Sequence, residues 1–382
     1  MQPRERGKTH CSLAVVAAAI VLFLVPGTMA HPATGIVVDR QGQVFFSDLE
    51  TVWKLSTDGK LSVFRQGVSG RHVHELAIDA QDNIYGADVS YESAHNKWIS
   101  DVWKMTPDGK ISYLLEPTTD PPSGMSIWLD QKGNMFSIDQ NNHTKTQTLL
   151  LMRTVDGKVT TFAGGSYGHA DGKGPAARFS SVGGMAFGFD GHLYLTDGTS
   201  VRKVTMDGVV STLANNLAFR TAEDKPTLFG GSEGILSGLT VDSHGNVYVA
   251  DAGNRRLLRI ANDGKVMIVY RADPPYFPNG VFAAPSDDLY VMEVGFTLPS
   301  KWSGPRVRKI SADGKNTLLA TVGGQEAGTL RRSVARALGV TVESSLQFLL
   351  GRFKFLLLVL SAILIAAITF AWRKRRRQRM VS

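Results

Sequence analysis

The feature that most constrains this chain is a unit of about 50 residues that occurs six times in succession. Each copy ends in an Asp-Gly pair, and the six pairs begin at residues 58, 108, 156, 207, 263 and 313. The fifth copy is the clearest: it reads Gly-Leu-Thr-Val-Asp at 238–242, Gly-Asn-Val-Tyr-Val-Ala-Asp at 245–251 and Asp-Gly-Lys at 263–265. Repeats of this length indicate stacked supersecondary units that share one continuous core.

Each unit contains four short stretches of β-branched and aromatic residues, separated by turns that contain Gly or Asp. Asp-Gly between alternating apolar residues is a strong hairpin signal, and we expect both turn residues to adopt positive φ angles. Four strands per unit without helices are typical of a β-propeller blade, whereas a solenoid of the same period is the alternative. We therefore predict an all-β, six-bladed β-propeller over residues 31–325, closed around a central channel.

Both ends of the chain carry membrane-targeting signals. Residues 1–30 combine a basic start, a short apolar stretch and a small-residue segment ending at Ala30, which predicts a signal peptide cleaved at that point. Residues 355–372 are uncharged and long enough to cross a bilayer as one transmembrane helix, and residues 373–382 form a basic stop-transfer tail. Residues 326–354 form a juxtamembrane segment. We expect a single-pass membrane protein with the propeller outside the cytoplasm and the tail inside it.

Charge and cysteine content exclude several classes of function. The formal net charge is +8, but the basic excess lies in the terminal segments, so residues 31–325 are mildly acidic. Nucleic acid is therefore not an expected partner. The single cysteine, Cys11, lies in the predicted signal peptide, so neither a disulfide framework nor a cysteine-ligated zinc site is expected.

One segment resembles a known repeat family. Residues 162–179 read Phe-Ala-Gly-Gly-Ser-Tyr-Gly-His-Ala-Asp-Gly-Lys-Gly-Pro-Ala-Ala-Arg-Phe, which is similar to the NHL-repeat signature. The sixth unit, with Pro-Asn-Gly-Val at 278–281 and Leu-Tyr-Val-Met-Glu at 289–293, resembles blades of the strictosidine-synthase-like and senescence-marker/gluconolactonase propellers. The resemblance implies six blades. It leaves two functions open, because NHL proteins are mostly binding platforms, whereas several of the other relatives are metal-dependent hydrolases.

The resemblance also implies where a metal site would lie. In the gluconolactonase-type relatives, oxygen ligands converge on the channel from the start of each innermost strand. The matching positions here are Thr34, His74, Met125, Gly183, Ser237 and Asn279. Only Asn279 fits that ligand pattern, His74 would be an isolated nitrogen ligand, and no carboxylate is present. We therefore expect no metal or cofactor. Calcium or zinc, with Asn279 and His74 as ligands, belongs to the alternative of a metal-dependent lactonase or esterase.

Other catalytic signals are weak, and no catalytic residue is assigned. The string Gly-Gly-Ser-Glu-Gly at 230–234 matches the nucleophile-elbow pattern but lies between blades of an all-β protein. His72 and His74 share one face of a predicted strand, where they line the channel or face solvent. Acidic residues recur at one place in five units, which favours acceptance of backbone N–H bonds in turns over catalysis; they are Asp48, Asp88, Asp139, Asp197 and Asp251.

The predicted loops carry the main functional hypothesis. Long insertions at 88–101, 116–124, 214–236, 270–279 and 293–305 all belong to connections that share one face of a propeller. Aromatic residues within them predict a binding face; they are Tyr91, Trp98, Tyr276, Phe277 and Trp302. We therefore predict an interaction platform for an extracytoplasmic protein or glycan, with the gluconolactonase-type hydrolase as the alternative.

Overall fold

The computed structural model describes residues 34–323, apart from residues 93–96, 119–127, 131, 141–144, 226–234 and 298–300. The predicted signal peptide, juxtamembrane segment, transmembrane helix and basic tail lie outside these residues. Within the part of the chain that the structure describes, no helix is long and apolar enough to cross a membrane.

Six antiparallel sheets form the blades; each contains four strands that follow one another in sequence, and the sheet of blade 4 has a fifth strand at its outer edge. Blade 1 consists of β1 (Ile36–Val38), β2 (Val44–Ser47), β3 (Val52–Leu55) and β4 (Leu61–Arg65). Blade 2 consists of β5 (Arg71–Ile78), β6 (Ile84–Glu92), β7 (Lys97–Met105) and β8 (Ile111–Thr118). Blade 3 consists of β9 (Trp128–Leu129), β10 (Met135–Gln140), β11 (Gln147–Arg153) and β12 (Val159–Ser166). Blade 4 consists of β14 (Val182–Phe187), β15 (Leu193–Asp197), β16 (Ser200–Val204) and β17 (Val209–Ala214). Blade 5 consists of β18 (Leu236–Val241), β19 (Val247–Asp251), β20 (Arg256–Ile260) and β21 (Val266–Arg271). Blade 6 consists of β22 (Tyr276–Ala283), β23 (Leu289–Thr297), β24 (Lys301–Ile310) and β25 (Asn316–Thr321).

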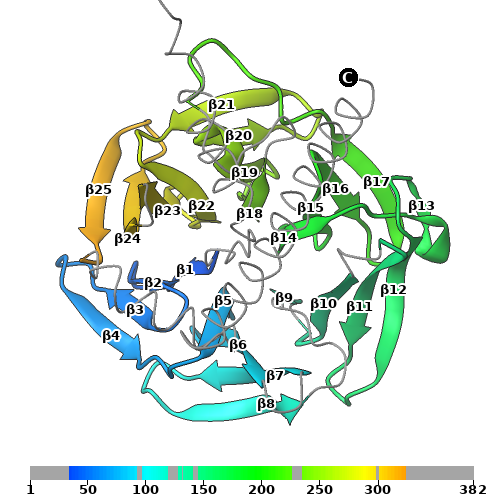
Figure 1. Cartoon of the computed structure of the whole chain (residues 1–382), viewed down its shortest axis with the longest axis horizontal. Helices are drawn as coiled ribbons and strands as arrows, with labels where there is room; N and C mark the ends of the chain where they lie inside the picture. The colour runs from blue at the N-terminus through cyan, green and yellow to red at the C-terminus, as the bar shows by residue number, and fades with distance from the viewer. Residues whose placement is uncertain are drawn as a thin grey trace, which may run out of the picture. The chain divides into compact units, whose positions relative to one another are not determined.

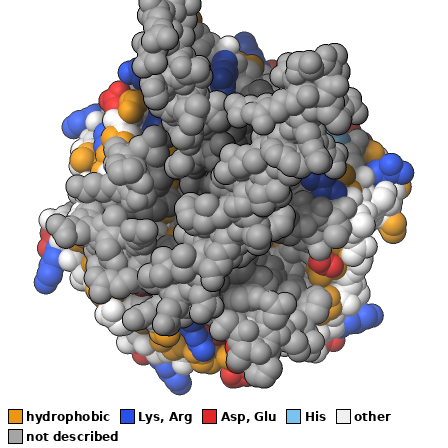
Figure 2. Space-filling model, viewed as in Figure 1, with side chains coloured by type: hydrophobic (Ala, Val, Ile, Leu, Met, Phe, Trp, Pro, Cys, Tyr) orange, Lys and Arg blue, Asp and Glu red, His pale blue; other side chains and the backbone are white. Residues whose placement is uncertain are grey.

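The blades close into a ring, with β1, β5, β9, β14, β18 and β22 around the centre and the fourth strands at the periphery (Figure 1). This arrangement confirms the six-bladed β-propeller and excludes the solenoid. Basic side chains lie at several separate places around the rim of the ring (Figure 2). Because consecutive strands are antiparallel, each innermost strand begins on the face that also carries the connections between second and third strands. We call this the mouth face; the Asp-Gly turns lie on the opposite face.

The Asp-Gly turns differ from the predicted geometry. Only the glycine of each pair has a positive φ, between 80° and 90°, and none of the six aspartates does. In the first blade, Gly59 N–H donates to the carbonyl of Ser56, and Ser56 N–H donates to that of Lys60. This is a type I turn followed by one left-handed residue, a three-residue hairpin loop whose twist also matches the strands.

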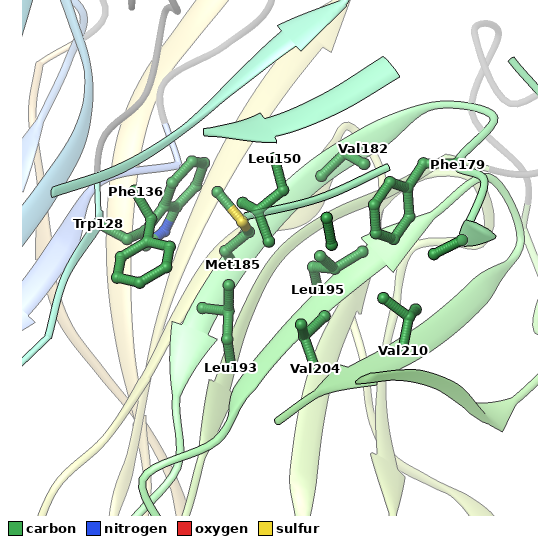
Figure 3. Packing of buried hydrophobic residues seen from close by; sticks show 12 residues of the cluster. Trp128, Phe136, Leu150, Phe179, Val182, Met185, Leu193, Leu195, Val204 and Val210 are labelled. Atoms are coloured by element: carbon green, nitrogen blue, oxygen red, sulfur yellow. The ribbon is translucent and has the colours of Figure 1, made fainter. Parts of the chain in front are cut away.

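Apolar side chains fill the spaces between blades. The largest cluster joins blades 3 and 4, where Phe136, Leu150, Phe179 and Leu193 are fully buried (Figure 3). The seam between the last and first blades is closed in the same way, with Met292 packed in one cluster with Phe46. Among the described residues, each blade consists of its own consecutive strands, and no strand is exchanged between the last blade and the first. Side-chain packing therefore holds these two blades together.

The NHL-like segment forms an additional edge of blade 4. A short strand, β13 (Gly172–Lys173), pairs with β17 and makes this sheet five-stranded. The 3-10 helix η1 (Gly174–Ala176) follows it, and a second one, η2 (Ala252–Asn254), lies in blade 5. The segment therefore stabilises the outside of the neighbouring blade, away from the channel.

Candidate functional site

The innermost strands of four blades contain a β-bulge at the same place, where two residues lie opposite one residue of the second strand. The bulged pairs are His74–Glu75, Gly183–Gly184, Ser237–Gly238 and Asn279–Gly280. Bulges redirect side chains and are frequent beside functional sites. The first residues of these pairs are the positions that the sequence assigned to the channel, so these four positions are equivalent in the structure.

Glycine at the second bulge position allows the innermost strands to approach each other closely. A Cβ on Gly280 would lie 2.2 Å from the carbonyl oxygen of Thr34, and one on Gly238 would lie 2.8 Å from that of Asn279. Gly184 and Gly35 make equally close approaches to the blades that follow them. Side chains are therefore excluded at this level of the ring in blades 1, 4, 5 and 6.

Blade 2 places Glu75 at the position that glycine occupies in those four blades. Its side chain is half-buried, so it keeps an accessible edge while protein atoms surround it on most sides. Burial raises the pKa of Glu75 to about 8, and no opposing charge accompanies that effect. The Glu75 carboxyl group is therefore mostly protonated at neutral pH and can donate a proton.

Two histidines, His72 and His74, belong to the same strand as Glu75. The rings of His72 and His74 are 6.0 Å apart, centroid to centroid, in an edge-to-face arrangement. Burial lowers the pKa of His72, so this imidazole is neutral at pH 7 and can accept a proton. His74 is 9% exposed, and Asn279, in blade 6 on the other side of blade 1, is 3% exposed. We call His72, His74, Glu75, Ser237, Asn279 and Thr34 the channel-mouth cluster.

The remaining predicted channel residues are polar or small. The Ser237 hydroxyl donates to the carbonyl of Ala250 at 3.2 Å, and the Thr34 hydroxyl donates to that of His74 at 3.5 Å. Gly183 contributes only backbone to the channel wall, and Met125 lies outside the described residues. Thus the titratable groups of the cluster all come from β5.

The donor set of the channel mouth does not fit a divalent cation of the kind implied by the resemblance. Such a cation requires several oxygen ligands that include carboxylates. Burial raises the pKa of the one carboxyl group here, and His72, His74 and Glu75 do not form a group whose ligand atoms all lie within 4.8 Å of one another. Among the described residues, the group of His and acidic ligand atoms that meets this distance is Asp242, His244 and Asp287, on the opposite face. Asp242 there is already bonded to Asn246 and Tyr248.

The five predicted aromatic anchors differ in their surroundings. Phe277 is 7% exposed and packs with Ala252 and Val294, so its burial corrects the expectation that it faces a partner. Tyr276 is half-buried, and the guanidinium of Arg306 stacks on its ring with Cζ 3.6 Å from the centroid. For the other three, the backbone is described: Tyr91 pairs with Trp98, and Trp302 pairs with Phe296.

Two of the predicted loops are hairpins. β6 and β7 extend through the insertion at 88–101, and β23 and β24 extend through the insertion at 293–305. Alternating aromatic and polar residues continue the strand pattern in both segments, which explains why the strands lengthen there. Only residues 272–275 connect blade 5 to blade 6, because the ends of the predicted insertion at 270–279 lie within strands.

The recurrent acidic residues have structural roles. Asp48 accepts backbone N–H bonds from Glu50 and Thr51, and Asp251 accepts one from Asn254, which confirms the turn role for these two residues. Asp88 instead receives a hydrogen bond from the Arg65 guanidinium at 3.1 Å and one from the Trp103 indole. The Arg65 guanidinium therefore compensates the buried charge of Asp88 and links blade 1 to blade 2.

Glu75 is the candidate site residue that the sequence-based prediction missed. The signal was present, because at the position after the channel residue four of the five other units have Gly, at 35, 184, 238 and 280, whereas the second unit has Glu at 75. The string Gly-Gly-Ser-Glu-Gly at 230–234 lies outside the described residues and stays untested.

Comparisons with known proteins establish the fold. No family model and no curated protein matches this chain. A luciferin-regenerating enzyme covers 78% of this chain and 96% of its own length at 16% identity and a TM-score of 0.50. A virginiamycin B lyase from Staphylococcus aureus covers 76% and 85% at 16% identity and a TM-score of 0.45. A gluconolactonase from Xanthomonas campestris covers 68% and 83% at 15% identity and a TM-score of 0.45.

Proposed function

We propose that this propeller is an enzyme that opens a lactone or ester of a small molecule by general acid–base catalysis at the channel-mouth cluster. The observation that carries the proposal is Glu75, a carboxyl group at a bulge position that is glycine in four other blades, next to His72 and His74 on β5. The enzymatic proposal replaces the binding platform as the main hypothesis. It retains the hydrolase that was the alternative, but the reaction involves no metal.

The perturbed ionisation of the cluster supports the proposal. An acid whose pKa is raised and a base whose pKa is lowered, on the same strand, are typical of paired proton donors and acceptors. Structural ion pairs also perturb pKa values, but burial is the cause of both shifts here, without an opposing charge. The luciferin-regenerating enzyme shows that this fold accommodates enzymes.

The residues suggest a simple mechanism. His72 accepts a proton from a water molecule, and the water oxygen attacks the carbonyl carbon of the lactone or ester. The carbon–oxygen bond to the leaving alcohol breaks, and the leaving oxygen takes the proton of Glu75. Transfer of the proton from His72 to Glu75 through solvent then restores both groups. Asn279 and Ser237 provide hydrogen-bonding groups that orient the substrate across the channel.

Turnover by variants of the purified chain tests the proposal. Against a panel of lactones and aryl esters, we expect Glu75→Gln and His72→Asn each to lower kcat/KM by about 100-fold or more. Glu223→Gln is the matched control, because the Glu223 side chain is 76% exposed on the mouth face, and it should leave the rate unchanged. Absence of turnover across the panel, or equal activity of Glu75→Gln and the unmodified chain, would contradict the proposal.

A second candidate is binding of a protein or glycan by the mouth face of a membrane-tethered chain. The long β6–β7 and β23–β24 hairpins favour it, because both project from the same face and contain Trp98 and Trp302. A pull-down with the full chain should lose its captured partner in Trp98→Ala and Trp302→Ala and retain it in Lys110→Ala on the opposite face. Equal capture by all three variants would exclude this surface.

A further inference from the structure

A second feature of the mouth face, between blades 5 and 6, has no role in the proposed reaction. Arg255 lies in the connection between β19 and β20, directly after η2, and is 9% exposed. Its backbone is left-handed, with φ 58° and ψ 39°, a conformation that is rare for residues other than Gly, Asn and Asp. Strained backbone of this kind is concentrated at functional sites.

Among the described residues, the Arg255 guanidinium has no acidic partner. Its Nη1 donates to the backbone carbonyl of Tyr276 at 2.6 Å, and its buried Nε has no hydrogen-bond acceptor among the described residues. Burial lowers the pKa of Arg255, and no carboxylate offsets that effect. The contrast with Arg256 is direct, because that neighbouring guanidinium pairs with both Asp251 and Asp224. A buried arginine without a counter-ion is costly unless an anion is supplied from elsewhere.

A second guanidinium contacts the same tyrosine. Arg306 stacks on the Tyr276 ring, and its buried Nη2 also has no acceptor in the described part of the chain. Its Nε donates to Glu293, but Arg308 donates to the same carboxylate oxygen. One carboxylate therefore serves two guanidinium groups, and no ion pair of the described residues joins Arg255 to a carboxylate.

We propose that Arg255 and Arg306 bind an oxyanion, a phosphate or a carboxylate group of a ligand, on either side of Tyr276. Planar guanidinium groups with free N–H donors match the geometry of such anions. Tyr276 begins β22, and Asn279 of the channel-mouth cluster follows three residues later, roughly 10 Å along an extended strand. The site therefore lies nearer the rim of the mouth face than the proposed catalytic groups and is independent of the catalytic proposal.

Titration of the purified full chain with inorganic phosphate, and separately with acetate, tests the site and distinguishes the two anions. We expect phosphate or acetate to raise the melting temperature more than potassium chloride at equal ionic strength does, because binding to the folded state stabilises it. Arg255→Gln and Arg306→Gln should each weaken that binding by about tenfold or more, since each removes a charge-assisted hydrogen bond.

Arg259→Gln is the control. Arg259 lies on β20, the strand that begins directly after Arg255, toward the opposite face, and its Nη2 bonds to Asn246. The substitution causes the same loss of charge. If Arg255→Gln does not fold, Arg255→Lys decides the question, because lysine keeps the charge but lacks the planar pair of donors, so its anion binding should be weaker. Equal binding by these variants and the unmodified chain, or no effect beyond potassium chloride, would overturn the site. Binding is measured without turnover, so its outcome is separate from that of the catalytic proposal.

Discussion

At the scale of single residues, the molecule is characterised by charged groups held in low-dielectric surroundings. Most of them are compensated: Asp197 pairs with Arg202 at 2.7 Å, and Asp251 pairs with Arg256 at 2.8 Å. Glu75 and Arg255 are the informative exceptions, because burial disfavours their charged forms and no opposite charge offsets it. Both lie on the mouth face, where a substrate or an anion can supply the missing partner.

Glu75 makes stability depend on pH in a defined direction. Its pKa rises from 4.5 to about 8 on folding, so the folded state binds more protons between these values and stability falls as the pH increases through this window. Glu75→Gln removes that dependence. Urea unfolding at pH 5 and pH 8 should show the variant gaining stability relative to the unmodified chain as the pH rises, by at least about 1 kcal/mol. A constant difference between the two proteins would show that Glu75 ionises normally.

At the scale of elements, the bulge with its glycine sets the width of the channel. Gly280→Ala would place a Cβ 2.2 Å from the Thr34 carbonyl oxygen, which forces β22 away from β1. We expect unfolding free energy to fall by about 1–3 kcal/mol, the usual cost of overpacking. Gly323→Ala, which meets nothing within 4 Å, should change it by less than about 0.5 kcal/mol. Denaturant titration measures both, and equal values would mean that the strands do not depend on this close approach.

The strands and turns also show how much of the structure could be predicted from the sequence. The repeat predicted the blades, the strand order and the register of Thr34, His74, Ser237 and Asn279, because hairpins and alternation are local signals. The turn type was wrong, since Asp-Gly is compatible with two loop lengths that give different φ angles at Asp. The burial of Phe277 depends on packing against Ala252 of the neighbouring blade, which no local pattern encodes.

At the scale of the whole molecule, the ring closes through side-chain packing between blades 6 and 1. Met292 is fully buried at this seam. Met292→Ala should lower the unfolding free energy by about 2–5 kcal/mol because it leaves a cavity in the core. Leu318→Ala, at a site 47% exposed on the outermost strand, should have little effect. A small effect of Met292→Ala in urea unfolding would mean that the seam contributes little to closure.

The location of the ring relative to a membrane is a separate prediction. A signal peptide at 1–30 and a transmembrane helix at 355–372 would place the propeller outside the cytoplasm. Protease added to intact cells should then digest the propeller and spare an epitope on residues 373–382. Protection of the propeller in cells that remain intact would contradict this topology.

The pH dependence of hydrolysis tests the central proposal most directly. With a lactone or ester that the chain turns over, kcat/KM should follow a bell-shaped profile. It should rise as His72 loses its proton, below pH 6.5, and fall above about pH 8 as Glu75 loses its proton. In Glu75→Gln the alkaline limb should disappear along with most of the activity. An alkaline limb that persists in this variant, or a rate that increases steadily up to pH 10, would contradict general acid catalysis by Glu75.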